Sequence, residues 1–321
     1  MYKKLSIIIP FYNSEKTLGA CLESLRDLLN NNCIEIILID DNSTDNSFII
    51  AKHFELRNKN IKLIHLDYNN GVSNARNIGL SLADGRYILF LDSDDRLIKI
   101  HFLLRMLDNL DNRNDIIVFG RMVYKSKYER CCVPYKGNVL LYDFINTNLS
   151  AFFNPTILMW VTNKLYLNEI IRNYDLKFNT KISFAEDMCF NLDYYKHIKN
   201  IYFIDNYFSI YNRNIENSLS RKNECKNISL MIDSFSKIKD FLRLFKKDKS
   251  EDFMIAQKNL IMYATKKVLY CEKIDKKQKL AELKHLFKYK KLLIKYLDGN
   301  DTLENKILGY LKNKNFRFEE E

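Results

Sequence analysis

The stretch Tyr87-Ile-Leu-Phe-Leu-Asp92-Ser-Asp94-Asp95 decides both the fold and the chemistry of this chain. Residues 87–91 are apolar, and aromatic or β-branched side chains are prominent among them, as expected of a strand buried on both faces. Three carboxylates follow within four positions, where they repel one another and resist desolvation. A cation such as Mg2+ or Mn2+ removes this repulsion, because its positive charge is bound by the carboxylates together with the phosphates of a ligand. The alternative is a polar turn, since Asp and Ser are common turn residues.

Strands and helices alternate over the first 120 residues. This alternation predicts an α/β fold, with a mostly parallel, Rossmann-like central sheet that is flanked by helices and has right-handed crossovers. In such sheets ligands bind at the carboxyl ends of the strands. The chain has no G-x-G-x-x-G and no G-x-x-x-x-G-K motif, which excludes the usual dinucleotide-binding fold and a P-loop. Strands are predicted at 5–9, 34–39, 61–66, 87–91, 115–119, 200–204 and 207–211.

Composition narrows the class of protein further. No apolar run reaches 18 residues, so no transmembrane helix is expected. None of the seven cysteines forms a C-x-x-C pair, which favours free thiols in a reducing compartment over a disulfide framework. The five histidines show no ligand spacing, which argues against a zinc site.

The C-terminal region, 222–321, differs from the rest of the chain. It holds 24 Lys and Arg against 15 Asp and Glu, whereas the remainder is nearly balanced. A basic surface of this kind attracts nucleic acid, anionic lipid or an acidic substrate, although a solvated face is the commoner case. No nucleic-acid recognition motif accompanies it. Helices are predicted at 224–246, 251–271, 276–297 and 301–313.

Four motifs carry a family resemblance through their order. They are Ser6-Ile-Ile-Ile-Pro10-Phe-Tyr12-Asn13, Ile39-Asp40-Asp41-Asn42-Ser43-Thr44-Asp45, Ala75-Arg76-Asn77-Ile-Gly79 and Phe90-Leu-Asp92-Ser-Asp94-Asp95. Together they resemble the inverting glycosyltransferases of family 2, which have the GT-A fold, and most of all the bacterial enzymes that build capsule, O-antigen or lipooligosaccharide. The resemblance implies a catalytic domain over 1–221, followed by a basic helical region over 222–321.

The resemblance implies a nucleotide-sugar donor and a divalent cation, Mn2+ or Mg2+. Tyr12 would stack on the base, Asp41 would accept the imide N–H of the base, and Arg76 would lie near the diphosphate. Asp92 would lie near the ribose and the water shell of the metal, and Asp94 would bind the metal. The remaining donor-side residues implied by the resemblance are Pro10, Asn13, Ser93, Arg213 and Ser218, of which the last two lie in a run placed over the nucleotide.

Each of these roles has a structural alternative. Tyr12 can be a loop aromatic that plugs the edge of the core. Asp41 can be a helix N-cap, unless Ser43 caps instead. Arg76 can form an ion pair with nearby acids, which does not exclude a role at the diphosphate.

Asp187 matches the proposed catalytic base of the family, and Glu186 would support or position it. An inverting transfer needs one carboxylate that takes the proton from the acceptor hydroxyl as its oxygen attacks the anomeric carbon. The alternative is a pair of acids that the helix dipole favours at a helix N-terminus.

The resulting hypothesis is transfer of a sugar from a nucleotide-sugar, with UDP-sugar as the expected donor, to a surface polysaccharide or lipooligosaccharide acceptor. The protein is expected to be cytoplasmic and to have no nucleic acid as partner. A peripheral contact between its basic helices and an anionic inner membrane is the sharper hypothesis for the C-terminal region. The alternatives are an inactive nucleotide-sugar-binding subunit of a polysaccharide assembly complex and a metal-dependent phosphotransfer protein. The second lacks a matching nucleophile and lysine in this sequence.

Overall fold

The computed structural model describes residues 3–109, 114–124, 127–150, 157–182, 185–212, 236–272, 275–297 and 302–312. The chain divides into two compact units, Met1–Ile215 and Glu216–Glu321. The motifs quoted above all lie in the first unit.

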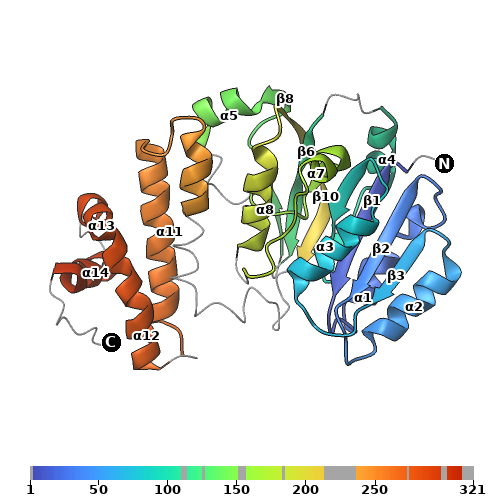
Figure 1. Ribbon diagram of the computed structural model, residues 1–321, viewed down its shortest axis with the longest axis horizontal. Helices are drawn as coiled ribbons and strands as arrows, with labels where there is room; N and C mark the ends of the chain where they lie inside the picture. The colour runs from blue at the N-terminus through green and yellow to red at the C-terminus, as the bar shows by residue number, and fades with distance from the viewer. Residues whose placement is uncertain are drawn as a thin grey trace. The chain divides into compact units, whose positions relative to one another are not determined.

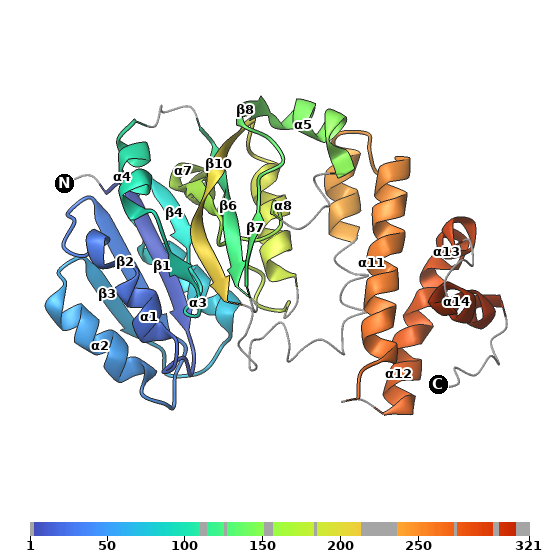
Figure 2. The same ribbon diagram turned by 180° about the vertical axis from the view of Figure 1, so that it is seen from behind.

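The first unit is an α/β structure, as predicted (Figures 1 and 2). Its strands are β1 (Leu5–Phe11), β2 (Ile34–Asp40), β3 (Ile61–His65), β4 (Tyr87–Phe90), β5 (Arg96–Leu97), β6 (Ile116–Tyr124), β7 (Tyr128–Cys131), β8 (Gly137–Leu140), β9 (Lys164–Leu167) and β10 (Asn200–Asn212). Its helices are α1 (Leu18–Glu23), α2 (Ser47–Arg57), α3 (Val72–Leu82), α4 (Ile100–Asn109), α5 (Leu141–Thr147), α7 (Asn168–Asn173) and α8 (Glu186–Tyr195).

The described strands form one sheet in the order β3-β2-β1-β4-β9-β6-β10-β5, with β7 paired to β6 and β8 to β10. The strands β3, β2, β1 and β4 are parallel, as their apolar runs predict. The strands predicted at 200–204 and 207–211 are one strand, β10, and the register shift near Tyr207 marks a bulge between them. The strands β6 and β7 pair antiparallel.

The strand β9 was not predicted, and it separates the parallel strands β1 and β4 from β6 and β10. It pairs antiparallel with both β4 and β6, so that Ile88 faces Tyr166 and Val118 faces Lys164. Since β9 runs against its neighbours, its first residue lies at the edge where β4 ends. The chain segment before Lys164 therefore reaches the same edge as the acidic loop after β4.

Helices cover both faces of the parallel strands. On one face α1 and α4 bury leucines against alternate residues of β1, including Ile7 and Ile9 (Figure 2). On the other face α3 packs on β1 so closely that a Cβ on Gly79 would come within 2.4 Å of Ile8 Cγ2. Only glycine permits that approach, which fixes α3, and with it Arg76, above the central strand.

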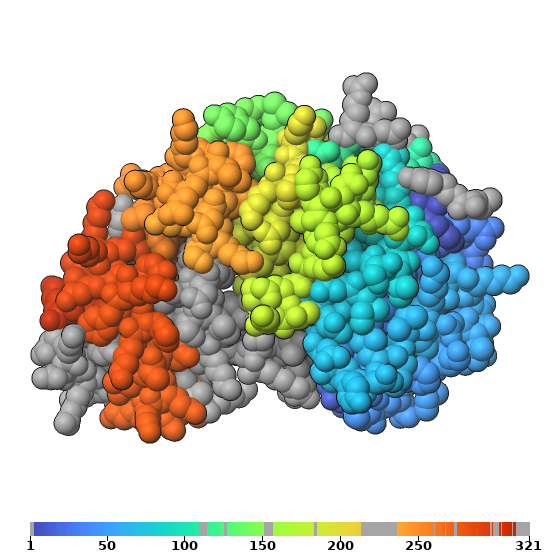
Figure 3. Space-filling model, viewed as in Figure 1, coloured from blue at the N-terminus to red at the C-terminus, as the bar shows by residue number. Residues whose placement is uncertain are grey.

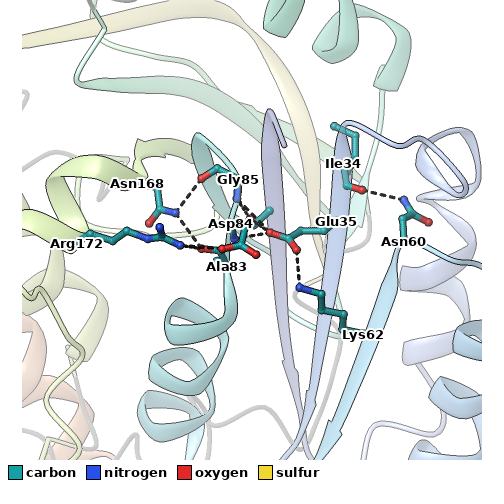
Figure 4. A network of polar contacts seen from close by, with 10 residues as sticks. Ile34, Glu35, Asn60, Lys62, Ala83, Asp84, Gly85, Asn168 and Arg172 are labelled. Carbon is teal, nitrogen blue, oxygen red and sulfur yellow. Dashed lines mark hydrogen bonds and ion pairs between the residues drawn. The ribbon is translucent and has the colours of Figure 1, made fainter. Parts of the chain in front are cut away.

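A buried carboxylate organises the opposite, amino-terminal edge of the sheet (Figure 4). Glu35 accepts hydrogen bonds from Ser6 Oγ at 2.6 Å, the Asp84 N–H at 2.6 Å and Lys62 Nζ at 3.0 Å. Burial alone would raise its pKa, but these hydrogen bonds hold the pKa of Glu35 below its usual value. We call Glu35 with these partners the Glu35 network, which anchors the turn between α3 and β4.

The helices α3 and α8 come together through the segment between α7 and α8. Asn77 Nδ2 donates to the Phe178 carbonyl at 2.8 Å, and the Phe178 N–H donates back to Asn77 Oδ1 at 2.8 Å. The Phe178 ring stacks on Phe190 of α8 with centroids 4.2 Å apart. In Figure 3 the α7–α8 region, in yellow-green, lies against α3, in cyan. These contacts place the start of α8 beside Arg76.

The second unit is helical where it is described. Residues 236–243 are helical, followed by α11 (Glu251–Leu269), α12 (Lys276–Lys284), a 3₁₀ turn (His285–Tyr289), α13 (Lys290–Tyr296) and α14 (Thr302–Lys312). The helix predicted at 276–297 is thus interrupted by the 3₁₀ turn, and most of the one predicted at 224–246 lies outside the described residues. Where the chain is described, no helix combines the length and apolarity that crossing a bilayer requires.

The expectation of free thiols is correct for Cys21, Cys33, Cys131, Cys132 and Cys189. It is wrong for Cys271, which follows α11 and its C-cap Tyr270 and is disulfide-bonded. The lipid-binding role of the basic helices stays a prediction.

Candidate active site

The acidic loop after β4 gathers charge in a partly buried place. Asp92 and Asp94 are half-buried, whereas Asp95 is buried and accepts a hydrogen bond from the Asn212 N–H of β10 at 3.3 Å. Its second oxygen, Oδ2, is buried without a partner among the described residues. Burial and the Asp92 charge raise the pKa of Asp94 to about 7, and burial raises the pKa of Asp95 well above its usual value. The loop therefore holds the unrelieved charge conflict that its sequence predicts.

Arg76 on α3 joins this loop to the start of α8. Its guanidinium donates to Asp92 Oδ1 at 2.9 Å and to Asp187 Oδ1 at 2.6 Å, and it lies 3.6 Å from Glu186 Oε1. Arg76 is only 3% exposed, and its Nε has no partner among the described residues. Burial opposes its charge, but the three carboxylates raise the pKa of Arg76. The predicted ion pair is present, and the arginine stands between the proposed metal loop and the proposed base.

Glu186 and Asp187 are the first two residues of α8. Ala185 precedes them in a left-handed conformation, with φ of 59°, which sets the direction in which the helix starts. Burial raises the pKa of Asp187 above its usual value against the opposing charge of Arg76. Burial and Asp187 raise the pKa of Glu186 to about 7. A carboxylate with a raised pKa is suited to accept a proton near neutral pH.

Asp41 belongs to a separate set of contacts. Its carboxylate accepts the N–H groups of Asn70 at 2.9 Å and Gly71 at 2.8 Å, and so holds the turn before α3. It is not the N-cap of the helix that follows it, because α2 begins after Asn46. Each oxygen keeps a further lone pair, so that the role at the nucleotide base stays a prediction.

The loop after β1 carries the other predicted donor-side residues. Tyr12 is 47% exposed, so its ring does not plug the core edge. Asn13 Oδ1 accepts the Thr44 N–H at 2.8 Å, which ties this loop to the one after β2. The hydroxyls of Ser14 and Ser93 lie 2.9 Å apart and tie it to the acidic loop. Pro10 is a buried residue of β1 next to Ile39.

Two buried basic side chains near Asp187, those of Arg121 and Lys164, were not predicted from the sequence. Arg121 of β6 lies over the Trp160 ring, 3.3 Å from its centroid, and donates to Thr162 Oγ1 at 3.2 Å. Lys164, the first residue of β9, is 0% exposed. Their signal was faint, because Lys and Arg are rarely buried and only their place in or beside apolar runs marks them. Arg213 and Ser218 lie outside the described residues.

The acidic loop fits a divalent cation that is shared with a diphosphate. Among the described residues no three His, Cys, Asp or Glu side chains can hold a metal by themselves. Mg2+ sites, however, use one or two carboxylates together with substrate phosphates. The raised pKa of Asp94 and the unpartnered oxygen of Asp95 are what such a loop shows without added positive charge. Asp94 and Asp92 are the residues that would hold the ion.

A mixed sheet with an acidic loop after its central strand, and two acids at the start of a helix beside it, is the architecture of the GT-A glycosyltransferase fold. The chain belongs to glycosyl transferase family 2, because the model of that family matches residues 6–174, more than half of its length.

Curated relatives carry related descriptions. The chain is 34% identical over 225 residues to the uncharacterized glycosyltransferase EpsJ of Bacillus subtilis, covering 68% of this chain and 64% of EpsJ. It is 32% identical over 207 residues to a poly(ribitol-phosphate) beta-glucosyltransferase of Bacillus spizizenii, covering 62% of this chain and 30% of that protein. The chain thus spans less than two thirds of the length of either relative.

Solved structures confirm the fold. The chain resembles S. aureus TarS in complex with UDP-GlcNAc, with a TM-score of 0.65 and 19% identity, over 96% of this chain and 87% of TarS 1-349. It also resembles the mannosyltransferase PcManGT of Pyrobaculum calidifontis in complex with GDP-Man and Mn2+, with a TM-score of 0.55 and 12% identity, over 97% of this chain and 86% of that one. At these identities the likeness shows the fold alone.

Proposed function

We propose that this chain is an inverting glycosyltransferase that moves a sugar from a UDP-sugar to a hydroxyl group of a cell-surface polymer. The observation that carries the proposal is the bridge from Asp92 through Arg76 to Asp187, because it brings the proposed metal loop within one side chain of the proposed base. Family membership supports the reaction class, and the described ligand of TarS supports UDP as the nucleotide. The acceptor class rests on relatives described as acting on poly(ribitol-phosphate).

In the proposed reaction the acceptor oxygen attacks the anomeric carbon as the bond from that carbon to the diphosphate oxygen breaks. The bond electrons leave with UDP, and the acceptor proton moves to a free lone pair of Asp187. The guanidinium of Arg76 can exchange a carboxylate partner for a phosphate group of the donor. Both carboxylate and phosphate present oxygen atoms that accept the paired N–H groups of arginine. When bound at Asp94 and Asp92, Mn2+ or Mg2+ supplies positive charge to the departing diphosphate.

A donor panel tests the proposal. The protein is incubated with Mn2+ and with UDP-, GDP-, CMP- and dTDP-sugars, while thermal shift and release of the nucleotide are followed. The proposal expects stabilisation and turnover with a UDP-sugar and metal only. Asp94→Ala should lose the metal dependence together with activity. An inactive nucleotide-sugar-binding subunit would show the shift without turnover, and the absence of both with every UDP-sugar would reject the proposal.

A further inference from the structure

The turn formed by residues 157–161 carries the inference. It lies just before β9 and includes Trp160, the only tryptophan of the chain. Val161 is fully buried, and its N–H points at Asp187 Oδ2 at 3.3 Å. The turn therefore holds the second oxygen of the proposed base, while Arg76 holds the first.

Each of the four carbonyl groups from residue 157 to residue 160 accepts a hydrogen bond from a buried side chain. Lys164 Nζ donates to the carbonyls of Ile157, at 2.7 Å, and of Trp160. The Leu158 carbonyl accepts from Tyr195 Oη at 2.6 Å, and the Met159 carbonyl accepts from Asn191 Nδ2 at 2.8 Å. Such saturation is unusual for a turn, whose carbonyl groups ordinarily face water. It leaves the backbone of this turn a single orientation.

Lys164 makes the largest contribution to this hold. Its three donors meet three acceptors, because Asn163 Oδ1 also lies 2.8 Å from Nζ. The residue is 0% exposed, and burial lowers the pKa of Lys164 well below its usual value, against the nearby charge of Asp187. Burying this group is costly unless all its donors are used. Among the described residues Lys164 donates to backbone and amide acceptors and to no carboxylate, which is an expensive way to stabilise a fold.

The same turn is fixed from its other side. Arg121 lies 3.3 Å from the centroid of the Trp160 ring and 4.3 Å from that of Tyr211. The Arg121 guanidinium packs on the indole ring of Trp160, while Lys164 donates a hydrogen bond to the Trp160 carbonyl. Two buried cations from adjacent strands thus converge on one turn, whose N–H meets the proposed base.

We propose that Lys164 is a positioning residue for sugar transfer: by holding the carbonyls of Ile157 and Trp160, it fixes the Val161 N–H against the Asp187 carboxylate. This inference rests on the proposed function for its kinetic part only. Lys164 contacts neither the donor-side loops nor Arg76 through any described hydrogen bond. Its loss should therefore lower the rate of the chemical step and leave donor binding in place.

Adjacent tyrosines on α8 provide a matched test. Tyr195 Oη donates to the Leu158 carbonyl of the turn, whereas Tyr194 Oη donates to the Asp115 carbonyl, at 2.6 Å as well, outside the turn. Both side chains are almost fully buried, and either change to Phe removes one hydroxyl. Tyr195→Phe and Tyr194→Phe should lose similar stability, but only the first loosens the turn.

The experiment combines Trp160 fluorescence with UDP release from the UDP-sugar that the panel identifies. Tyr195→Phe should shift the Trp160 emission and lower kcat about tenfold, and Lys164→Met should lower kcat about a hundredfold, with donor KM changed less than about twofold in both. Tyr194→Phe should keep the emission and kcat of the unaltered protein. Wild-type emission and kcat in Tyr195→Phe, or equal losses in Tyr194→Phe, would overturn the inference.

The two proposals fail separately. If no UDP-sugar is turned over, the proposed function is rejected, and the emission spectra alone then decide whether Tyr195 holds the turn while Tyr194 does not. If Lys164→Met does not fold, Tyr195→Phe and its control still give the answer.

Discussion

Buried carboxylates have opposite surroundings at the amino-terminal and the carboxyl-terminal edge of the central sheet, which are the two ends of its parallel strands. At the amino-terminal edge, Glu35 is surrounded by donors, and its pKa lies below the usual value (Figure 4). At the carboxyl-terminal edge, Asp94 and Glu186 crowd other acids, and the pKa of each is raised to about 7. At the first edge several donors surround one carboxylate, whereas at the second edge one guanidinium, that of Arg76, is shared by Asp92, Glu186 and Asp187. A site for a cation and a diphosphate is expected to look like the second edge.

Removing the proposed base at the carboxyl-terminal edge should give the largest effect, and the quantity that changes is kcat. Asp187→Asn keeps the shape of the side chain but removes its ability to take the acceptor proton, so that kcat should fall about 10²–10⁴-fold. Nucleotide binding, followed by thermal shift with UDP and Mn2+, should persist. Asp193→Asn, on the same helix but in an ion pair with Lys196, is the control and should keep full activity. Intact transfer in Asp187→Asn would remove the base assignment.

Removing the positive charge of Arg76, which joins the acids, should give the next largest effect, a loss in the free energy of unfolding. Arg76→Met leaves Asp92, Glu186 and Asp187 without their shared partner, and breaking a buried ion pair costs about 3–5 kcal/mol. Urea unfolding at neutral pH measures the loss. Arg86→Met is a control, since its guanidinium lies over the Tyr87 ring away from these acids. A loss in Arg76→Met no larger than in Arg86→Met would contradict the central role of Arg76.

Breaking the amino-terminal edge should change stability without changing the chemistry. Glu35→Gln removes the negative charge that accepts hydrogen bonds from Ser6, Lys62 and the Asp84 N–H. The free energy of unfolding should fall by about 1–3 kcal/mol. Because the folded pKa of Glu35 is lowered, its contribution is present above the unfolded value near pH 4.3 and is lost as the pH falls through the folded value. Urea unfolding should show a larger difference in the free energy of unfolding at pH 7 than at pH 3.

The exposed Glu169 of α7 supplies the control for that measurement, and Glu169→Gln should lie within about 0.5 kcal/mol of the unaltered protein. Donor KM and kcat should be unchanged in both variants. A kcat that falls in Glu35→Gln would mean that the two edges are not independent.

Relieving the charge at the acidic loop should change stability with the opposite sign. The folded pKa of Asp94 is raised to about 7, so its contribution to stability is present below the unfolded value near pH 3.9 and is lost as the pH rises through about 7. Without metal at pH 8, the melting temperature of Asp94→Asn should therefore exceed that of the unaltered protein by about 2–4 °C for each kcal/mol gained in the free energy of unfolding. At pH 4 the two melting temperatures should be similar.

Metal and nucleotide sharpen the same comparison. Mn2+ with UDP should stabilise the unaltered protein more at pH 8 than at pH 5, and should stabilise Asp94→Asn little at either pH. Asp205→Asn, an exposed change on β10, should follow the unaltered protein throughout. A lower melting temperature for metal-free Asp94→Asn at pH 8 would contradict the raised pKa.

The parallel strands and the acids after them were readable from sequence because both leave local patterns. Buried parallel strands are continuous apolar runs, and Asp92 stands directly after one of them. Arg76 and Asp187 came from motif resemblance, and their contact at 2.6 Å could not be read, since it joins residues 111 positions apart. The predicted break at 205–206 turned out to be a bulge within β10, because polar residues there interrupt the pattern without ending the pairing.

The residues that were not predicted depend on partners that no local pattern shows. Lys164 lies between Asn163 and Leu165, and nothing in that stretch shows that the carbonyls of Ile157 and Trp160 accept from its ammonium. Glu35 lies inside the apolar run predicted as the strand at 34–39, and an acid inside such a run is itself a sign of a buried network. The short β9 was missed because a strand of four residues that begins with a lysine carries too little periodicity.

The reversed direction of β9 changes which part of the chain reaches the site. Parallel strands bring the chain to the carboxyl-terminal edge only as they end, whereas β9 leaves that edge as it begins. We therefore expect substitutions within residues 157–161 to change the surroundings of the proposed base, while β1, β2 and β4 keep their pairing.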